Sequence, residues 1–230
     1  IFNAMSVLSK DPLIREGAAP RTTQAAEGLR RRRFTVAEIT AFVEHGLIDK
    51  KEGFELIGGE IVPMSPKGLF HERLKTALMI YFVRALPPGV LVSQETAFYL
   101  SEDTFLGPDF VFYEEADGLE KLNGETCLLA VEVADSSLSY DRGRKADLYA
   151  SFGVKELWVV DVRARSIRVF RNPTPTGYAN VVDIASDAAA TALNASMRNS
   201  ASAVRATMAT TRSVAANRCR SSKAGSAVPA

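Results

Sequence analysis

Three short apolar stretches in the middle of the chain, at residues 110–113, 128–133 and 157–162, constrain its fold most strongly. Each has the length and the content of valine, leucine and phenylalanine that are typical of a strand buried inside a sheet. Two carboxylates accompany them, because Asp109 precedes the first stretch and Glu132 lies inside the second. Burying a carboxylate is costly unless a cation or a dense shell of hydrogen bonds compensates it. The pattern therefore favours a metal site over ordinary core.

Helices and turns can be placed around these strands. Thr35 and Glu38 form a capping box that predicts a short helix ending at Gly46. Gly58 and Gly59 predict a tight hairpin, because glycine accepts the positive φ angles of such a turn. The hairpin joins strands at residues 54–57 and 61–64, and further short strands are predicted at residues 90–92, 95–100 and 167–170.

Two longer helices follow from apolar residues at helical spacing. The first covers residues 71–86 and stops at a Pro-Pro-Gly sequence. The second covers residues 141–152, with Ser139 or Asp141 as its N-terminal cap and Gly153 as its stop. Because this helix follows the strand that carries Glu132, it can pack back over the sheet.

The two ends of the chain differ from its middle. Residues 1–33 are rich in Ala, Gly, Pro and Arg without periodicity and predict a flexible basic leader. Residues 184–230 form an Ala-, Ser-, Thr- and Arg-rich tail of low complexity without any aromatic residue. Disorder, a basic helix that folds on a partner and a shifted reading frame are all open interpretations of this tail. The sequence thus predicts a single domain over residues 34–183.

The distribution of charge argues against binding nucleic acid through phosphate contacts alone. The chain has 28 basic and 27 acidic side chains, and six of the basic ones follow position 187, where no acid occurs. The part before that position is therefore mildly acidic, so a role with nucleic acid would need a metal or a local basic patch. Since no apolar run approaches the roughly 20 residues that span a bilayer, we expect a cytoplasmic protein without a membrane partner.

Two carboxylates and a lysine have the chemistry that phosphodiester hydrolysis requires. Asp109 and Glu132 could converge on one hard cation, with the backbone carbonyl of Val133 and waters completing the octahedral shell that Mg²⁺ prefers. Lys145 could then orient or activate the attacking water. A purely structural interpretation is also open, in which Asp141 and Lys145 form an i,i+4 pair, Asp109 closes a turn and Glu132 lies on a solvated edge.

Six blocks of the chain match one known family. They are residues 33–35, residues 54–66 with His71 after them, Gly107-Pro108-Asp109, residues 131–137, residues 140–145 and residues 153–161. With these blocks, residues 34–178 resemble the Uma-two-like family of putative restriction endonucleases, within the PD-(D/E)xK nuclease superfamily. The resemblance implies an α/β (α+β) fold with a restriction-endonuclease-like core, in which a mixed central β-sheet is flanked by helices and preceded by a helix and a β-hairpin.

The resemblance also implies a magnesium-dependent site for DNA cleavage, in which Mn²⁺ can substitute. Asp109 takes the place of the Asp of the Pro-Asp motif, and Glu132 that of the first acid of the second motif. Ala134 stands where the superfamily keeps its lysine, and Lys145 on the following helix matches the position to which this family has moved it. These three residues are the catalytic candidates, and the two acids with Val133 are the candidate metal ligands.

The remaining candidates lie around this centre. Glu55 and His71 fall on recurrent family positions and are auxiliary candidates together with Asp141; a solvated hairpin residue and a hydrogen-bonded helix-start histidine are the alternatives for the first two. Arg142 and Arg144 are candidates for binding nucleic acid, or lie on a solvated helix face. The predicted function is a DNA endonuclease, with a homodimer as a possible assembly. The alternative is an inactive nuclease-fold module that binds nucleic acid or a protein.

Overall fold

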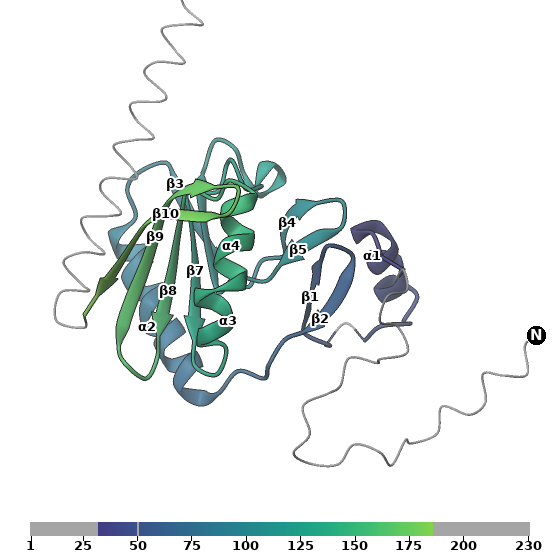
Figure 1. Ribbon diagram of the computed structural model, residues 1–230, viewed down its shortest axis with the longest axis horizontal. Coiled ribbons are helices and arrows are strands. Elements are labelled where there is room, and N and C mark those ends of the chain that lie inside the picture. Colours follow the sequence, from purple (N-terminus) through teal and green to yellow (C-terminus); the bar gives the residue numbers. More distant parts are fainter. Residues whose placement is uncertain (1–31, 50, 186–230) are drawn as a thin grey trace, which may run out of the picture. The chain divides into compact units, whose positions relative to one another are not determined.

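A mixed sheet of six strands forms the centre of the domain (Figure 1). The computed structural model describes residues 32–49 and 51–185. The strands are ordered β10-β9-β8-β7-β6-β3, and only the neighbours β7 and β8 run parallel. Their bounds are β3 Val90–Gln94, β6 Phe110–Glu114, β7 Leu129–Ala134, β8 Glu156–Asp161, β9 Ser166–Thr174 and β10 Gly177–Ile184.

Helices cover both faces of this sheet (Figure 1). Helix α2 (Leu69–Ala85) lies on one face, and α3 (Leu138–Arg142) and α4 (Arg144–Ser151) lie on the other. Alternation along β7 explains this arrangement, since successive side chains of a strand point to opposite faces. Val131 and Val133 pack with Phe82 of α2, whereas Ala130 and Ala134 belong to the core that contains Tyr149 of α4.

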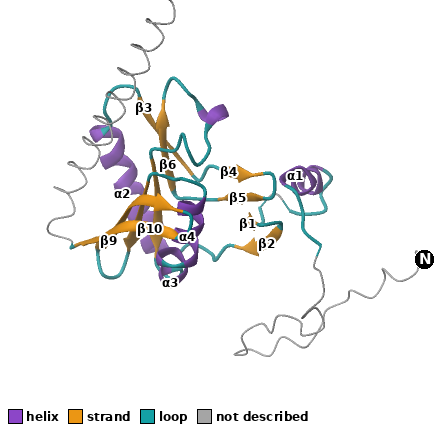
Figure 2. Ribbon diagram, turned by 45° about the horizontal axis from the view of Figure 1, so that its top comes forward, coloured by secondary structure: helices purple, strands orange, loops and turns teal. Residues whose placement is uncertain are grey.

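A second, smaller sheet stands beside the first (Figure 2). Its order is β2-β1-β5-β4, with β1 Phe54–Ile57, β2 Glu60–Pro63, β4 Phe98–Ser101 and β5 Thr104–Leu106. Gly58 and Gly59 form the predicted hairpin turn, with φ angles of 56° and 79°. Helix α1 (Val36–Glu44) starts with the predicted capping box, and its Val36 N–H donates to the carbonyl of Glu102.

The predicted fold class and the mixed sheet flanked by helices are confirmed, but several element boundaries are wrong. The predicted helix over residues 141–152 is two helices, α3 and α4, which meet at Gly143. Ser139 and Asp141 therefore lie inside α3 instead of capping a helix. The strand predicted from residue 95 starts at Phe98, because Glu95 has a φ angle of 52° that breaks the extended backbone.

Strands β5 and β10 were not predicted from the sequence. The leader and tail proposed for residues 1–33 and 184–230 lie almost entirely outside the described residues. Within the described part of the chain, no helix is both long and apolar enough to cross a membrane.

Phe82 of α2 packs against several aromatic side chains in the core between this helix and the sheet. It is fully buried, and its ring contacts those of Phe110, Phe112 and Trp158 at centroid distances of 5.2, 5.0 and 6.3 Å. We expect Phe82→Ala to lower the free energy of unfolding by about 3–5 kcal/mol, measured by urea denaturation. The neighbouring Val83 is 56% exposed. Val83→Ala should therefore change the free energy of unfolding by no more than about 0.5 kcal/mol. Equal effects of the two changes would contradict this packing.

Candidate active site

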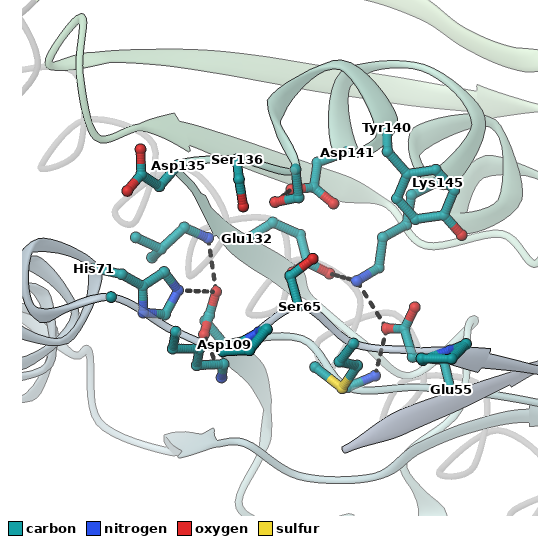
Figure 3. Close-up of a pocket in the computed structure, with 18 of the residues that line it drawn as sticks. Glu55, Ser65, His71, Asp109, Glu132, Asp135, Ser136, Tyr140, Asp141 and Lys145 are labelled. Atoms are coloured by element: carbon teal, nitrogen blue, oxygen red, sulfur yellow. Dashed lines mark hydrogen bonds and ion pairs between the residues drawn. The ribbon is translucent and has the colours of Figure 1, made fainter. Parts of the chain in front are cut away.

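A cavity of about 400 Å³ opens where the two sheets, α2 and the α3–α4 pair approach one another (Figure 3). Its walls come from segments far apart in the sequence, including β1, the loop between β2 and α2, and the ends of β6 and β7. Acidic and basic side chains from both sheets and from the helices meet in it. The acids are Glu55, Asp109, Glu132, Asp135 and Asp141, and the basic residues are Lys67, His71 and Lys145.

Asp109 and Glu132 meet because their strands pair. Strands β6 and β7 are antiparallel, with Phe110 facing Val131, so the same register continued by one residue sets Asp109 against Glu132. The Val133 N–H donates to Asp109 Oδ2 at 2.8 Å, which ties the aspartate directly to β7. Both carboxylates are 4% exposed. Glu132 thus lies on a central strand, and the alternative of a solvated edge is excluded.

Asp109 is held by two basic side chains as well. Lys67 Nζ donates to its Oδ1 at 3.0 Å, and His71 Nε2 lies 3.3 Å from its Oδ2. Burial alone would raise the pKa of Asp109, but the His71 hydrogen bond, the Lys67 charge and the Val133 N–H together lower it. The carboxylate is therefore kept in its ionised form, which is the form that binds cations.

Lys145 extends from the first turn of α4 between two carboxylates. Its Nζ lies 2.9 Å from Glu132 Oε1 and 2.8 Å from Glu55 Oε1, and all three side chains are buried. Burial would lower the pKa of Lys145, but Glu132, Glu55 and Asp141 raise it. The i,i+4 pair with Asp141, which belonged to the purely structural interpretation, is not formed. The lysine pairs with these two glutamates instead.

Glu55 is the residue of strand β1 in the small sheet that lines the cavity. It lies on β1 at 3% exposure, so the alternative of a solvated hairpin residue is excluded. Its Oε1 also accepts the Gly107 N–H at 2.9 Å, close to the Pro108-Asp109 segment. The glutamate therefore links β1, the start of β6 and, through Lys145, helix α4.

Glu132 is buried, and three other acidic side chains lie near it. Its Oε1 accepts the Tyr149 hydroxyl at 2.6 Å in addition to Lys145. Burial, with Asp141, Asp109 and Glu55 adding to it, raises the pKa of Glu132 in spite of Lys145. Tyr149 itself is fully buried and packs in the core.

Asp109 is one member of a closed ring of ion pairs, and sequence reasoning missed most of this ring. Lys67 also pairs with Glu95 at 2.7 Å, Glu95 with Lys75 at 2.6 Å, and Lys75 with Glu72 at 2.9 Å. His71 closes the ring, because its Nδ1 lies 3.1 Å from Glu72 Oε1 and its Nε2 contacts Asp109. Both nitrogens of His71 face carboxylates, and the bond to Asp109 is the largest cause that raises the pKa of this histidine.

One signal in the sequence could have exposed this ring. His71 and Lys75 occupy the same face of α2 as the buried Leu78 and Phe82. Charged side chains at buried positions of an amphipathic helix need partners, so their spacing points to an internal ion-pair network. Lys67 gave no such signal, because it lies in a loop.

The other candidates divide between the cavity and its surroundings. Asp141 lines the cavity and accepts a hydrogen bond from the Ser137 hydroxyl. Arg142 does not line it, and its Nη2 lies 3.4 Å from Asp161 Oδ2. Arg144 is exposed and also lies outside the cavity lining. The structure thus brings together Glu55, His71, Asp109, Glu132, Asp141 and Lys145, with Val133 beside them.

The donor set of this cavity fits a hard divalent cation, with protein side chains supplying part of the shell. Acidic side chains outnumber basic ones in the cavity, five against two lysines and one histidine. Among residues 32–49 and 51–185, no three acidic, histidine or cysteine side chains form a cation site by themselves. A cation held by Asp109 and Glu132 would therefore need backbone carbonyl and water oxygens as further ligands, as Mg²⁺ commonly does.

The mixed central sheet with helices on both faces is a restriction-endonuclease-like fold. A model of the Uma2 family, described as "Putative restriction endonuclease", matches residues 42–197. The chain belongs to this Uma2 family, as its sequence blocks predicted.

One solved structure agrees with this fold. The domain resembles a putative nuclease belonging to DUF820 from Anabaena variabilis ATCC 29413, with a TM-score of 0.51 and 14% identity over 65% of this chain and 83% of that chain. A DrdV–DNA complex is a weaker match, with a TM-score of 0.35 and 14% identity over 54% of this chain and 11% of that one. No match was found among curated proteins.

The Lys145 pairs should be important for stability. We expect Lys145→Met to lower the free energy of unfolding by about 3 kcal/mol, because Glu55 and Glu132 would remain buried without their shared cation. Lys121 is a matched control, since it pairs with Asp117 at 3.4 Å but is 66% exposed. Lys121→Met should cost less than about 1 kcal/mol. The measurement is urea denaturation at pH 7, and equal losses for both variants would show that Lys145 does not hold the glutamates.

Proposed function

We propose that this protein is a magnesium-dependent endonuclease that hydrolyses phosphodiester bonds of DNA. One observation carries the proposal: Asp109 and Glu132 take facing positions on paired strands, and Lys145 Nζ lies 2.9 Å from Glu132 Oε1. Two acids beside one lysine form the constellation that the family motifs predict. DNA is the proposed substrate because restriction endonucleases act on it and because the chain belongs to a family described in those terms.

Asp109 and Glu132 are the proposed ligands of Mg²⁺, with the Val133 carbonyl as the backbone ligand and Mn²⁺ as a substitute. When bound, the cation would polarise the scissile phosphate and favour hydroxide formation near neutral pH. Asp109 is well placed for this role, because the Val133 N–H and His71 fix its Oδ2 while its Oδ1 contacts a lysine on a loop. In this proposal His71 is a positioning residue that orients Asp109.

Lys145 is the proposed donor to the attacking water. An ammonium group has three N–H donors, and among the described residues Glu132 and Glu55 accept from two of them. One donor therefore remains for a water or a phosphate oxygen in the cavity. Glu55 and Tyr149 act indirectly, because they fix the positions of Lys145 and Glu132. Stabilising the negative charge that develops on the phosphate is the second effect of this ammonium.

A nuclease-fold module without turnover is the second candidate. It is favoured by one observation, namely that Lys67 and His71 already pair with both oxygens of Asp109. A site that is neutralised by its own side chains could bind a partner without needing a cation. Binding of DNA that persists in a chelator, with no cleavage of plasmid or single-stranded DNA under several metals, would identify this candidate.

Cleavage of DNA should depend on Asp109. We expect Asp109→Asn to slow Mg²⁺-dependent cleavage of plasmid and single-stranded DNA by at least about 100-fold, because it weakens the proposed cation site while keeping the side-chain shape. Asp183 is a suitable control, since it pairs with Arg168 and is 58% exposed on β10. Asp183→Asn should cleave like the unaltered protein. Full activity of the Asp109 variant would overturn the assignment of this residue.

Binding of the cation should also be visible without any substrate. We expect saturating Mg²⁺ or Mn²⁺ to raise the thermal unfolding temperature, since a ligand at 100 times its dissociation constant adds about 2.7 kcal/mol of stability. The increase should disappear in Glu132→Gln, which removes a buried carboxylate from the cavity. An equal increase in the variant and in the unaltered protein would place the cation elsewhere.

A further inference from the structure

A second cavity adjoins the candidate active site. Its volume is about 800 Å³, within the range of roughly 300–1,000 Å³ that is typical of ligand sites. The two cavities share one wall, formed by Met64, Ser65, Pro66, Lys67 and Gly107. A polymer whose phosphate is held in the first cavity can continue past that wall. The second cavity is thus close enough to receive the adjoining part of such a substrate.

The second cavity combines an aromatic wall with balanced charge. Phe54 and Phe105 line it, half-buried, with their rings 5.8 Å apart in an edge-to-face contact. Its acidic and basic residues are equal in number, in contrast to the acid-rich first cavity; they are Glu52, Glu95, Lys51 and Lys67. An aromatic wall beside lysines is the combination by which proteins bind single-stranded nucleic acid, because rings stack on bases and ammonium groups attract phosphates.

Lys67 stands at the junction of the two cavities. It lines both of them, and its side chain is 26% exposed. Among the described residues, Asp109 Oδ1 and Glu95 Oε1 accept from two of its three N–H donors, which leaves one for a further oxygen. Glu95 is also neutralised by Lys75, so its charge repels an approaching phosphate less than that of an unpaired acid would.

We propose that the second cavity is a nucleotide subsite, in which Lys67 binds a backbone phosphate next to the scissile one and Phe54 with Phe105 contacts an unstacked base. This inference rests on the proposed function, since it extends the path of the same substrate. Lys67 is then a binding residue of the nuclease in addition to a partner of Asp109.

The test measures binding of the full chain to a short fluorescent single-stranded oligonucleotide by anisotropy in EDTA, over a series of salt concentrations. Lys67→Met should lower the dependence of log Kd on log salt by about 0.7, the value for one phosphate contact to a single strand. Lys67→Arg keeps the charge and should keep the dependence. Lys121 is the control, because it pairs with Asp117, lies outside the ring of ion pairs and lines neither cavity. Lys121→Met should also leave the dependence unchanged.

The aromatic wall is tested in the same assay. Phe54→Leu keeps an apolar side chain but removes the ring, so affinity should fall by about 10-fold without a change in salt dependence. Tyr99 is the control, since its exposed ring contacts Phe105 but does not line the cavity. Tyr99→Leu should bind like the unaltered protein. Circular dichroism and urea denaturation establish that each variant is folded.

The outcomes distinguish a failure of the subsite proposal from a failure of the proposed nuclease function. Equal salt dependence in the Lys67→Met, Lys67→Arg and Lys121→Met variants, or equal affinity of the Phe54 and Tyr99 variants, would overturn the subsite even if cleavage depends on Asp109. The expected differences in binding would support the subsite even if no condition gave cleavage.

Discussion

The buried ammonium of Lys145 connects the two sheets of this domain. It lies between Glu132 on β7 of the large sheet and Glu55 on β1 of the small one. A buried charge is tolerated only where its partners are close and well oriented, so the pairing restricts how the sheets and α4 can be arranged. The cavity that contains Asp109 is formed by the same elements. Stability of the fold and geometry of the site therefore depend on one set of contacts.

Basic side chains partly neutralise the carboxylates at the place where a divalent cation is proposed to bind. Lys67, His71 and Lys145 pair with the carboxylates of the cavity, yet the acids are still in excess. The ring through Glu95, Lys75 and Glu72 keeps His71 and Lys67 against Asp109. An arrangement of this kind holds the ligands of a cation in place before it arrives, which lowers the reorganisation that binding requires.

Much of the fold and the candidate site could be predicted from local pattern. The apolar runs located β6, β7 and β8, the capping box located α1, and Gly58-Gly59 located the hairpin. Asp109 and Glu132 stood out because a carboxylate is unusual beside a strand that is apolar on both faces. Lys145 was placed by its spacing within the helix, together with the family blocks.

What could not be predicted depends on contacts that are distant in the sequence. Lys67 contacts Glu95 and Asp109, which lie 28 and 42 residues away, and its loop has no periodicity that would indicate them. Glycine inside a helical pattern lowers helix stability without marking a boundary, so the break at Gly143 was not evident. Strand β5 has only three residues, and β10 is an edge strand with several exposed side chains, so neither shows the pattern of a buried strand.

A crystal structure of the protein with Mn²⁺, analysed by anomalous scattering, would show whether Asp109 and Glu132 hold a cation. We expect one anomalous peak in the cavity, within bonding distance of a carboxylate oxygen of each residue and with Lys145 still beside Glu132. Lys67 should then no longer contact Asp109 Oδ1, the oxygen to which it donates at 3.0 Å without the ion. No peak in that cavity at millimolar Mn²⁺, with Asp109 still paired with Lys67 and His71, would contradict a metal-dependent nuclease site.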